Sequence, residues 1–199
     1  MPAELILASV SSTRARMLRQ AGLDLRIEVP RIDEETVRSA MQAEGATPRD
    51  IADALATMKA LRISARHPGA IVIGCDQVLA VGRSVMGKPA DLSAARAQLQ
   101  QLRGQAHQLL SAVVVCQDGT VLWRHVGQAR LVMRRFSDDW LEGYLARNAA
   151  TISTSVGGYR IEEEGIRLFS AIEGDYFTIL GLPLLPLLSW LDLRGEIPS

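Results

Sequence analysis

The segment Ile71–Val81 constrains the fold more than any other part of this sequence, because it combines an apolar strand with one acidic residue. The run Ile71-Val72-Ile73-Gly74-Cys75 ends at Asp76. A short apolar run bounded by turn residues is typical of a buried strand. A carboxylate in that setting is expected to pair with a cationic side chain, bind a metal or take part in a reaction. We therefore expect a sheet that buries this strand between helices and presents Asp76 at a site.

Strand-type and helix-type segments alternate along the chain, which is typical of an α/β protein. Turn residues at Gly82-Arg83-Ser84 and Gln117-Asp118-Gly119 predict hairpins, so the sheet is expected to be mixed. With 199 residues, the chain suffices for one domain or two small lobes. The predicted strands cover residues 5–8, 25–29, 71–81, 108–115 and 120–133. The predicted helices cover residues 14–22, 48–65, 93–104, 137–147 and 184–193.

Charge and hydropathy exclude several classes of function. The formal net charge is zero and the pI is about 6.8, which argues against a basic nucleic-acid scaffold. The longest apolar stretch, residues 179–191, contains Pro183 and Pro186 and is too short to span a bilayer. Met1-Pro2-Ala3-Glu4 lacks the basic start of a signal peptide. The two cysteines lie in separate apolar runs, as buried thiols would. We expect a cytoplasmic protein that binds neither nucleic acid nor membrane.

Lysine is rare in this chain and marks two positions. Of the 22 basic residues, only Lys59 and Lys88 are lysines. An ammonium is a compact charge with three donors, suited to a single phosphate oxygen. Lys88 follows Asp76 by twelve residues, within Gly87-Lys88-Pro89. A strand that ends in a carboxylate, followed by a turn that carries a lysine, is typical of a site that binds a metal and a phosphate ester. The alternative is that the two lysines have no functional meaning and are present by chance.

A second phosphate-binding candidate lies after the first strand. Ser9 and Ser11 precede a predicted helix that carries Arg14 in its first turn. A helix N-terminus offers unpaired N–H groups and partial positive charge, hydroxyls add donors, and a guanidinium can bind two phosphate oxygens. An ordinary capped surface helix is the alternative.

Two further segments contain candidate ligands. Asp33-Glu34-Glu35 would be a solvated turn unless a metal lies nearby, since Mg²⁺ takes one or two carboxylates plus phosphate oxygens. Gly157-Gly158-Tyr159 permits close backbone approach to a ligand, and Glu162-Glu163-Glu164 could read a base edge. A glycine-rich turn leading into an exposed acidic hairpin is the alternative.

Two other kinds of site are rejected. Residues 82–88 match G-x-x-x-x-G-K, but Pro89 stands where a P-loop needs Ser or Thr and a helix start. The three histidines, His67, His107 and His125, share no metal-ligand spacing, so zinc is not expected. His107, before an apolar strand, is expected to be structural.

Taken in order, these segments resemble the Maf family of nucleoside triphosphate pyrophosphatases over about residues 5–191. The resemblance rests on Leu5-Ile6-Leu7-Ala8-Ser9 with Ser11 and Arg14, Asp33-Glu34, Lys59-Ala60, Ile73-Gly74-Cys75-Asp76-Gln77, Gly87-Lys88-Pro89, Gly157-Gly158-Tyr159 and Glu173-Gly174-Asp175 through Gly181-Leu182-Pro183-Leu184. It implies a Maf/Ham1-like fold: one domain over residues 1–199, with a mixed, twisted sheet flanked by helices and a cleft between two lobes. It also implies a cytoplasmic house-cleaning enzyme, commonly homodimeric, that splits a nucleoside triphosphate into the monophosphate and diphosphate.

The resemblance also implies roles for particular residues. Asp76 would be the catalytic carboxylate that activates water, and Glu34 would join it in holding a divalent cation, Mg²⁺ or Mn²⁺. Lys88 would act both in catalysis and in binding. The residues implied to bind the triphosphate are Ser9, Ser11, Arg14, Lys59 and Lys88. Cations and a metal at a polyphosphate would neutralise charge in the transition state.

Three positions are implied to set base preference: Thr13, Gln77 and Glu162. Gln77 and Glu162 agree with the family branch that prefers 7-methyl-GTP, whereas Thr13 agrees with neither branch and Gly158-Tyr159 is more similar to the dTTP/UTP branch. The resemblance therefore favours a modified purine triphosphate such as 7-methyl-GTP, with dTTP or UTP as the alternative. A nucleotide-binding regulator of cell division with little catalysis, and an unrelated hydrolase that releases single phosphates, are the competing hypotheses.

Overall fold

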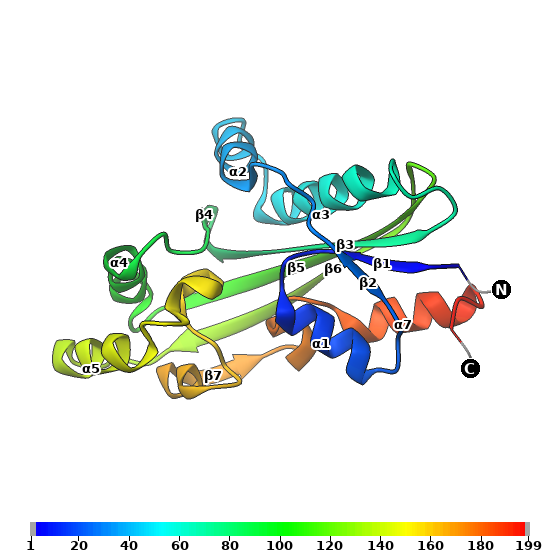
Figure 1. Ribbon diagram of the computed structural model, residues 1–199. Coiled ribbons are helices and arrows are strands. Elements are labelled where there is room, and N and C mark those ends of the chain that lie inside the picture. The colour runs from blue at the N-terminus through cyan, green and yellow to red at the C-terminus, as the bar shows by residue number, and fades with distance from the viewer. Residues whose placement is uncertain (1–2, 198–199) are drawn as a thin grey trace.

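The computed structural model describes residues 3–197 and contains one mixed seven-stranded sheet (Figure 1). Met1 and Pro2, part of the segment interpreted above as lacking a signal peptide, lie outside the described residues. The strand order is β2-β1-β3-β5-β6-β7, with β4 paired to β3. The strands are β1 (Leu5–Ala8), β2 (Arg26–Glu28), β3 (Ile71–Val81), β4 (Ser84–Met86), β5 (Ala106–Gln117), β6 (Thr120–Met133) and β7 (Phe169–Glu173).

The sheet is parallel at one edge and antiparallel elsewhere. Strand β1 pairs in parallel with both β2 and β3, whereas β3, β5, β6 and β7 are successively antiparallel. The β5–β6 hairpin turns at Asp118 and Gly119, both with positive φ. The prediction of a mixed sheet made from the hairpin turns is therefore confirmed.

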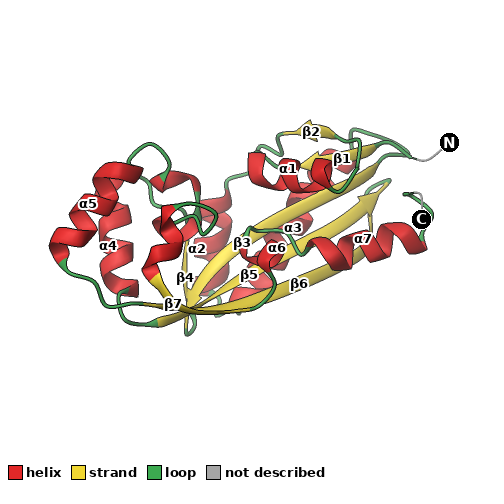
Figure 2. Ribbon diagram, turned by 90° about the horizontal axis from the view of Figure 1, so that it is seen from below, coloured by secondary structure: helices red, strands yellow, loops and turns green. Residues whose placement is uncertain are grey.

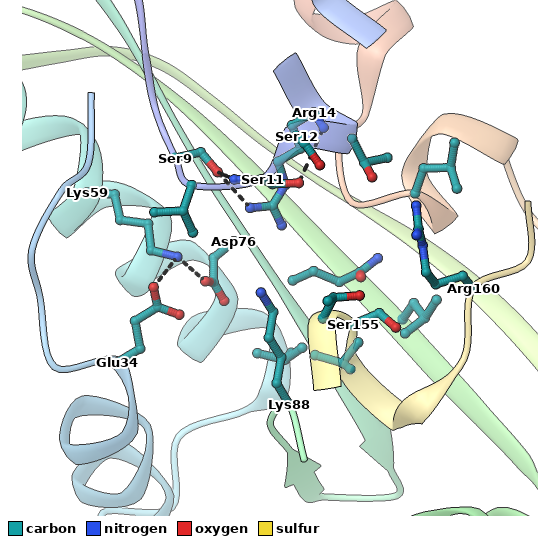
Figure 3. Close-up of a pocket in the computed structure, with 18 of the residues that line it drawn as sticks. Ser9, Ser11, Ser12, Arg14, Glu34, Lys59, Asp76, Lys88, Ser155 and Arg160 are labelled. Atoms are coloured by element: carbon teal, nitrogen blue, oxygen red, sulfur yellow. Dashed lines mark hydrogen bonds and ion pairs between the residues drawn. The ribbon is translucent and has the colours of Figure 1, made fainter. Parts of the chain in front are cut away.

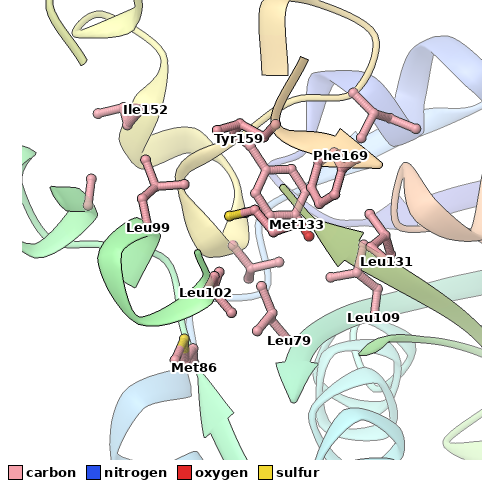
Figure 4. Packing of buried hydrophobic residues seen from close by; sticks show 14 of the residues in the cluster. Leu79, Met86, Leu99, Leu102, Leu109, Leu131, Met133, Ile152, Tyr159 and Phe169 are labelled. Carbon is pink, nitrogen blue, oxygen red and sulfur yellow. The ribbon is translucent and has the colours of Figure 1, made fainter. Parts of the chain in front are cut away.

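Helices cover both faces of the sheet and group toward its two ends (Figures 1 and 2). Helix α3 buries one face, and α1 and α7 bury the other, each with its own apolar cluster. A third cluster packs α4 and α5 against the far ends of the long strands (Figure 4). The helices are α1 (Ser12–Gln20), α2 (Glu34–Ala43), α3 (Pro48–Ser64), α4 (Leu92–Leu102), α5 (Asp138–Asn148), α6 (Tyr176–Ile179) and α7 (Leu184–Leu193).

Three local predictions need correction. Asp33-Glu34-Glu35 is not a solvated turn: Asp33 caps α2 by accepting a bond from the Thr36 N–H. Helix α4 begins at Leu92, one residue before the predicted start at 93, because the Asp91 carboxylate caps it by accepting from the Ala94 N–H. The segment after α5 does not form the exposed acidic hairpin that was the alternative for residues 157–164, but contains three 3₁₀ turns, η1 (Ile152–Thr154), η2 (Val156–Gly158) and η3 (Glu164–Leu168).

In the described part of the chain, one edge of β3 has no neighbouring strand near the middle of its length, and the candidate site lies at this opening. Strand β1 pairs with β3 only as far as Gly74, and β4 pairs with it only from Leu79 onward. Among residues 3–197, no strand pairs with residues 75–78 on that edge, whereas β5 runs along the whole opposite edge. Side chains from both faces of the sheet can therefore reach one opening beyond the carboxyl end of β1, the usual end for ligands in such sheets.

His107 is a buried structural residue, as the sequence predicted. Its ring is 2% exposed and lies 2.7 Å from the Tyr159 hydroxyl, between Tyr159 and Phe169. Burial lowers the pKa of His107 from its ordinary value of 6.5 to about 4. At a pH between these two values, His107 is therefore protonated in the unfolded state but neutral in the native state.

This depressed pKa gives a test of folding. As the pH falls from 6.5 to 4, the unfolded state binds a proton at His107 before the native state does, so stability is lost in that window, by about 3 kcal/mol in total. In a His107→Gln variant, this part of the pH dependence should vanish, as measured by urea unfolding between pH 4 and 7. Parallel pH curves for the two proteins would show that His107 does not titrate in this way.

Both cysteines are buried, and no helix within residues 3–197 has the length and apolar character needed to cross a bilayer. Burial raises the pKa of each thiol to about 11.

Candidate active site

A cavity of about 650 Å³ lies at the open edge of β3 (Figure 3). It is lined by segments that lie far apart in the sequence: the start of α1, the start of α2, α3, β3, the turn after β4, and the loop around η2. All ten residues to which the family resemblance assigns a role line this cavity: Ser9, Ser11, Thr13, Arg14, Glu34, Lys59, Asp76, Gln77, Lys88 and Glu162.

The start of α1 is built as a rigid corner. Ser11 is the N-cap and accepts from the Arg14 N–H, while Ser9 accepts from the Ser11 N–H. The Arg14 guanidinium donates to the Gly181 carbonyl at 2.7 Å and to the Cys75 carbonyl at 3.2 Å. Arg14 therefore joins α1 to β3 and to the loop after α6, and only part of its guanidinium remains for a phosphate.

The two lysines occupy different environments. Lys59 is buried and donates to Asp76 Oδ1 at 2.6 Å and to Glu34 Oε1 at 2.8 Å. Lys88 follows β4 and is exposed at the cavity wall. Because residues 84–86 form a strand and no helix begins at Lys88, the rejection of a P-loop is confirmed.

The Glu34–Lys59–Asp76 arrangement (Figure 3) sets the electrostatics of the site. Asp76 is 5% exposed, and its burial raises the pKa of its carboxyl, although Lys59 and Arg14 oppose the rise. Burial also acts on Glu34, which is half exposed, but there the charges of Lys59, Lys88 and Arg14 outweigh it and lower the pKa. The buried carboxylate is thus the better proton acceptor of the two.

Gln77 is restricted to accepting hydrogen bonds from a ligand. Its amide nitrogen donates to Ser111 Oγ and to the carbonyls of Thr178 and Ile179. These two carbonyl acceptors fix which end of the amide carries the nitrogen. The remaining Oε1 can therefore accept only from a donor such as a ring N–H.

Two residues of the loop after η2, Tyr159 and Glu162, are held by contacts within the protein. Glu162 is not a free carboxylate, because Arg160 donates to its Oε1 at 3.0 and 3.3 Å. Tyr159 does not offer a stacking surface: it is 5% exposed and packs edge-on against Phe169 in the far cluster. Gly157 and Gly158 do adopt positive φ, which bends this loop toward the cavity.

Three charged residues of the cavity wall were not singled out from the sequence: Arg31, Arg38 and Arg160. In a chain with 20 arginines, none of them stood out. With Arg14 and the lysines, they give the wall six cationic side chains against three anionic ones, Glu34, Asp76 and Glu162. An excess of positive charge suits an anionic polyphosphate.

The acidic residues fit a Mg²⁺-type ion that is completed by a substrate. Within residues 3–197, no cluster of three or more His, Cys, Asp or Glu side chains could hold a metal alone. Glu34 and Asp76 both contact the Lys59 ammonium, which shows that a cation is stabilised between them. Two carboxylates plus phosphate oxygens and water are an ordinary donor set for Mg²⁺.

Comparison with known proteins adds three observations. The profile of the family described as Maf-like protein matches residues 4–193. The nucleoside triphosphate pyrophosphatase of Roseobacter denitrificans is 57% identical over 198 residues, and that of Ruegeria pomeroyi is 55% identical over 199, each covering 100% of both chains. The 7-methyl-GTP pyrophosphatase of Brucella abortus is 47% identical over 196 residues, covering 98% of each chain.

Proposed function

Since this chain belongs to the family of Maf-like proteins, we propose that it hydrolyses a nucleoside triphosphate at the α–β phosphoanhydride, releasing the monophosphate and diphosphate. The observation that carries the proposal is the buried Asp76 carboxylate, paired with Lys59 at the edge of a cavity with excess positive charge. Full-length relatives with this activity in their names support it.

The two faces of β3 suggest how the nucleotide lies. Gly74 and Asp76 face α3, since a Cβ at Gly74 would meet the α3 backbone and Asp76 contacts Lys59. Gln77 faces the opposite side, toward α6. We place the polyphosphate beside α2 and α3 and the base beside Gln77, so that the α-phosphate crosses the open edge near Asp76.

In this placement of the nucleotide, the side chains of the cavity have different roles in the reaction. Asp76 orients the attacking water and accepts its proton, because burial raises its pKa and so makes it a better base. Lys59 holds Asp76 in place and offsets charge at the phosphates. Lys88, with Ser9, Ser11 and Arg14, binds phosphate oxygens and stabilises negative charge on the departing diphosphate.

A divalent cation, Mg²⁺ or Mn²⁺, would be held by Glu34 and Asp76. When bound, it would supply charge neutralisation and a Lewis acid at the phosphates. The Lys59 ammonium contacts both carboxylates, so it would keep their orientation fixed before substrate binds.

We propose a modified purine triphosphate as substrate, with 7-methyl-GTP as the first candidate and dTTP or UTP as the competitors. Gln77 Oε1 and the second oxygen of Glu162 are acceptors, and guanine presents two kinds of N–H donor on one edge. Thymine and uracil present one. Thr13 places a small side chain on the cavity wall, so stacking on an aromatic ring is not part of this proposal.

A product-resolved screen tests the reaction. The purified protein with Mg²⁺ or Mn²⁺ is given the standard triphosphates, 7-methyl-GTP and modified pyrimidine triphosphates, and products are separated by ion-exchange chromatography. We expect the monophosphate and diphosphate in equal amounts. Orthophosphate as the first product would support a different hydrolase, and intact bound nucleotide would support the regulator of cell division.

Replacing Glu162 tests base reading. Glu162→Gln keeps the shape but removes an acceptor and the charge partner of Arg160. We expect the ratio of kcat/KM between the preferred and next-best nucleotide to fall by about 10-fold, the effect of one hydrogen bond to a charged group, with a smaller change in overall rate. Competition between two nucleotides in one reaction measures this ratio.

Glu163→Gln is the matched control, because Glu163 also pairs with Arg160, at 2.6 Å, but does not line the cavity. Its base preference should equal that of the wild type. An equal loss on every nucleotide in Glu162→Gln would remove Glu162 as a base reader.

We further propose that residues 1–199 form one domain with two lobes, since β3, β5 and β6 run through both groups of helices (Figure 2). A cytoplasmic location and a homodimer remain predictions of the family resemblance, and light scattering tests the second.

A further inference from the structure

Arg38 is a largely buried cation that has no role in the proposed reaction. It lies on α2, four residues after Glu34, and therefore one helical turn further along the same face. Its side chain is only 12% exposed, and it lines the cavity. Among the described residues, its buried Nε has no hydrogen-bond partner.

The guanidinium of Arg38 lies directly against Gly87. A Cβ added to Gly87 would lie 1.7 Å from Arg38 Nη1 and 2.6 Å from its Cζ, so only glycine permits this packing. Gly87 has no positive φ, and its lack of a side chain is therefore needed for space rather than for backbone conformation. Arg38 thus bridges α2 and the turn that carries Lys88.

A purely structural role does not account for this arrangement. Within residues 3–197, the one ion pair of Arg38 is with Glu35, 2.8 Å away, whose side chain is 75% exposed. An exposed partner of this kind stabilises a fold little. Desolvating a guanidinium while leaving Nε unpaired is unfavourable, which is what a binding site awaiting an anion would show.

We propose that Arg38 binds the terminal phosphates of the substrate, and hence the departing diphosphate. This inference rests on the proposed function. Lys59 is already paired with two carboxylates, Arg14 with two carbonyls and Arg160 with two glutamates. Of the three remaining cations in the wall, Arg38 is the one held against the turn that carries Lys88, so these two side chains are placed together for the phosphates furthest from the base. Glu34 and Arg160 lie at opposite ends of the cavity in Figure 3, so the α2 end is remote from the base end.

Product inhibition separates this role from a structural one. Diphosphate and the nucleoside monophosphate are the two products, and only diphosphate would reach Arg38. In Arg38→Gln we expect the inhibition constant for diphosphate to rise by at least about 10-fold, the effect of losing one charge-assisted phosphate contact. The inhibition constant for the monophosphate should stay within about twofold of the wild type. KM for the triphosphate should rise more than kcat falls.

Two further variants sharpen the test. Gly87→Ala should reproduce the effect, because the new Cβ displaces the guanidinium while residue 38 remains arginine. Arg83→Gln is the control, since Arg83 is exposed, donates to the Gly45 carbonyl and does not line the cavity. It should leave both inhibition constants unchanged.

Calorimetric binding of inorganic diphosphate, with and without Mg²⁺, makes the outcome independent of turnover. If the wild type binds diphosphate and Arg38→Gln binds it equally well, or if both inhibition constants rise together, the role of Arg38 is wrong. If the wild type binds diphosphate through Arg38 but releases none from any nucleotide, the proposed reaction fails while the phosphate site stands.

Discussion

Replacing Asp76 with Asn should lower kcat by at least about 10³-fold, which lies within the range expected for the loss of a general base. The amide has the same shape but cannot accept a proton, and it also removes one carboxylate from the proposed cation site. The measurement is the rate of diphosphate release at saturating nucleotide and cation.

The Asp76→Asn variant should still fold. The amide oxygen can still accept from Lys59, and Glu34 keeps a negative charge 2.8 Å from the ammonium. We expect a loss of about 1 kcal/mol, or roughly 2–4 °C in melting temperature, for a chain of this size. A variant that folds normally but has lost its turnover would show that Asp76 acts in the reaction and is not needed for folding.

Asp53→Asn provides the matched control for Asp76→Asn. Asp53 lies on α3 and pairs with Arg124 at 2.6 Å, outside the cavity. Its kcat should match the wild type. Near-normal turnover in Asp76→Asn would show that the catalytic role belongs to another residue.

Replacing Gly74 with Ala should disrupt both the fold and the site. A Cβ at Gly74 would lie 2.3 Å from the Ala56 carbonyl oxygen and 2.7 Å from the Ala60 nitrogen, both backbone atoms of α3. Backbone cannot rotate away, so α3 has to shift from β3. Because Lys59 precedes Ala60, the shift would also pull its ammonium from Asp76.

We expect Gly74→Ala to destabilise the protein by about 3 kcal/mol, the upper range for inserting one methyl group into a tight core. Urea unfolding measures this loss. Activity should fall even below the melting temperature, since the Lys59–Asp76 distance changes in the folded state.

Gly69→Ala separates crowding from backbone strain. Gly69 has φ of +76°, but an added Cβ would meet nothing within 4 Å. It should therefore lose only about 1–2 kcal/mol through its backbone and keep its activity. If Gly74→Ala were no worse than Gly69→Ala, close packing of α3 on β3 would not be what places Lys59.

Much of this site was predictable because its residues sit on recognisable local elements. The apolar run before Asp76 predicted β3, and the caps after β1 predicted α1, so both were located correctly. Helix α2 was missed because Asp33-Glu34-Glu35 satisfies the pattern of a solvated turn as well as that of a capped helix start. Without α2, the four-residue spacing of Glu34 and Arg38 carried no meaning.

Contacts between distant segments could not be predicted. Lys59 and Asp76 are 17 residues apart, and their pairing depends on how closely α3 approaches Gly74. Arg160 and Glu162 are only two residues apart, yet their bond depends on the geometry of the turn between η2 and η3, which sequence patterns describe poorly. Sequence therefore predicted which residues gather at the cavity more reliably than how they are paired.

Hydrolysis in ¹⁸O-labelled water tests the central claim most directly, because it reports which phosphorus the water attacks. With Asp76 beside the α-phosphate, the account predicts one labelled oxygen in the nucleoside monophosphate and none in the diphosphate, as measured by mass spectrometry. Label in the diphosphate, or in orthophosphate, would contradict the placement of the substrate across the open edge of β3.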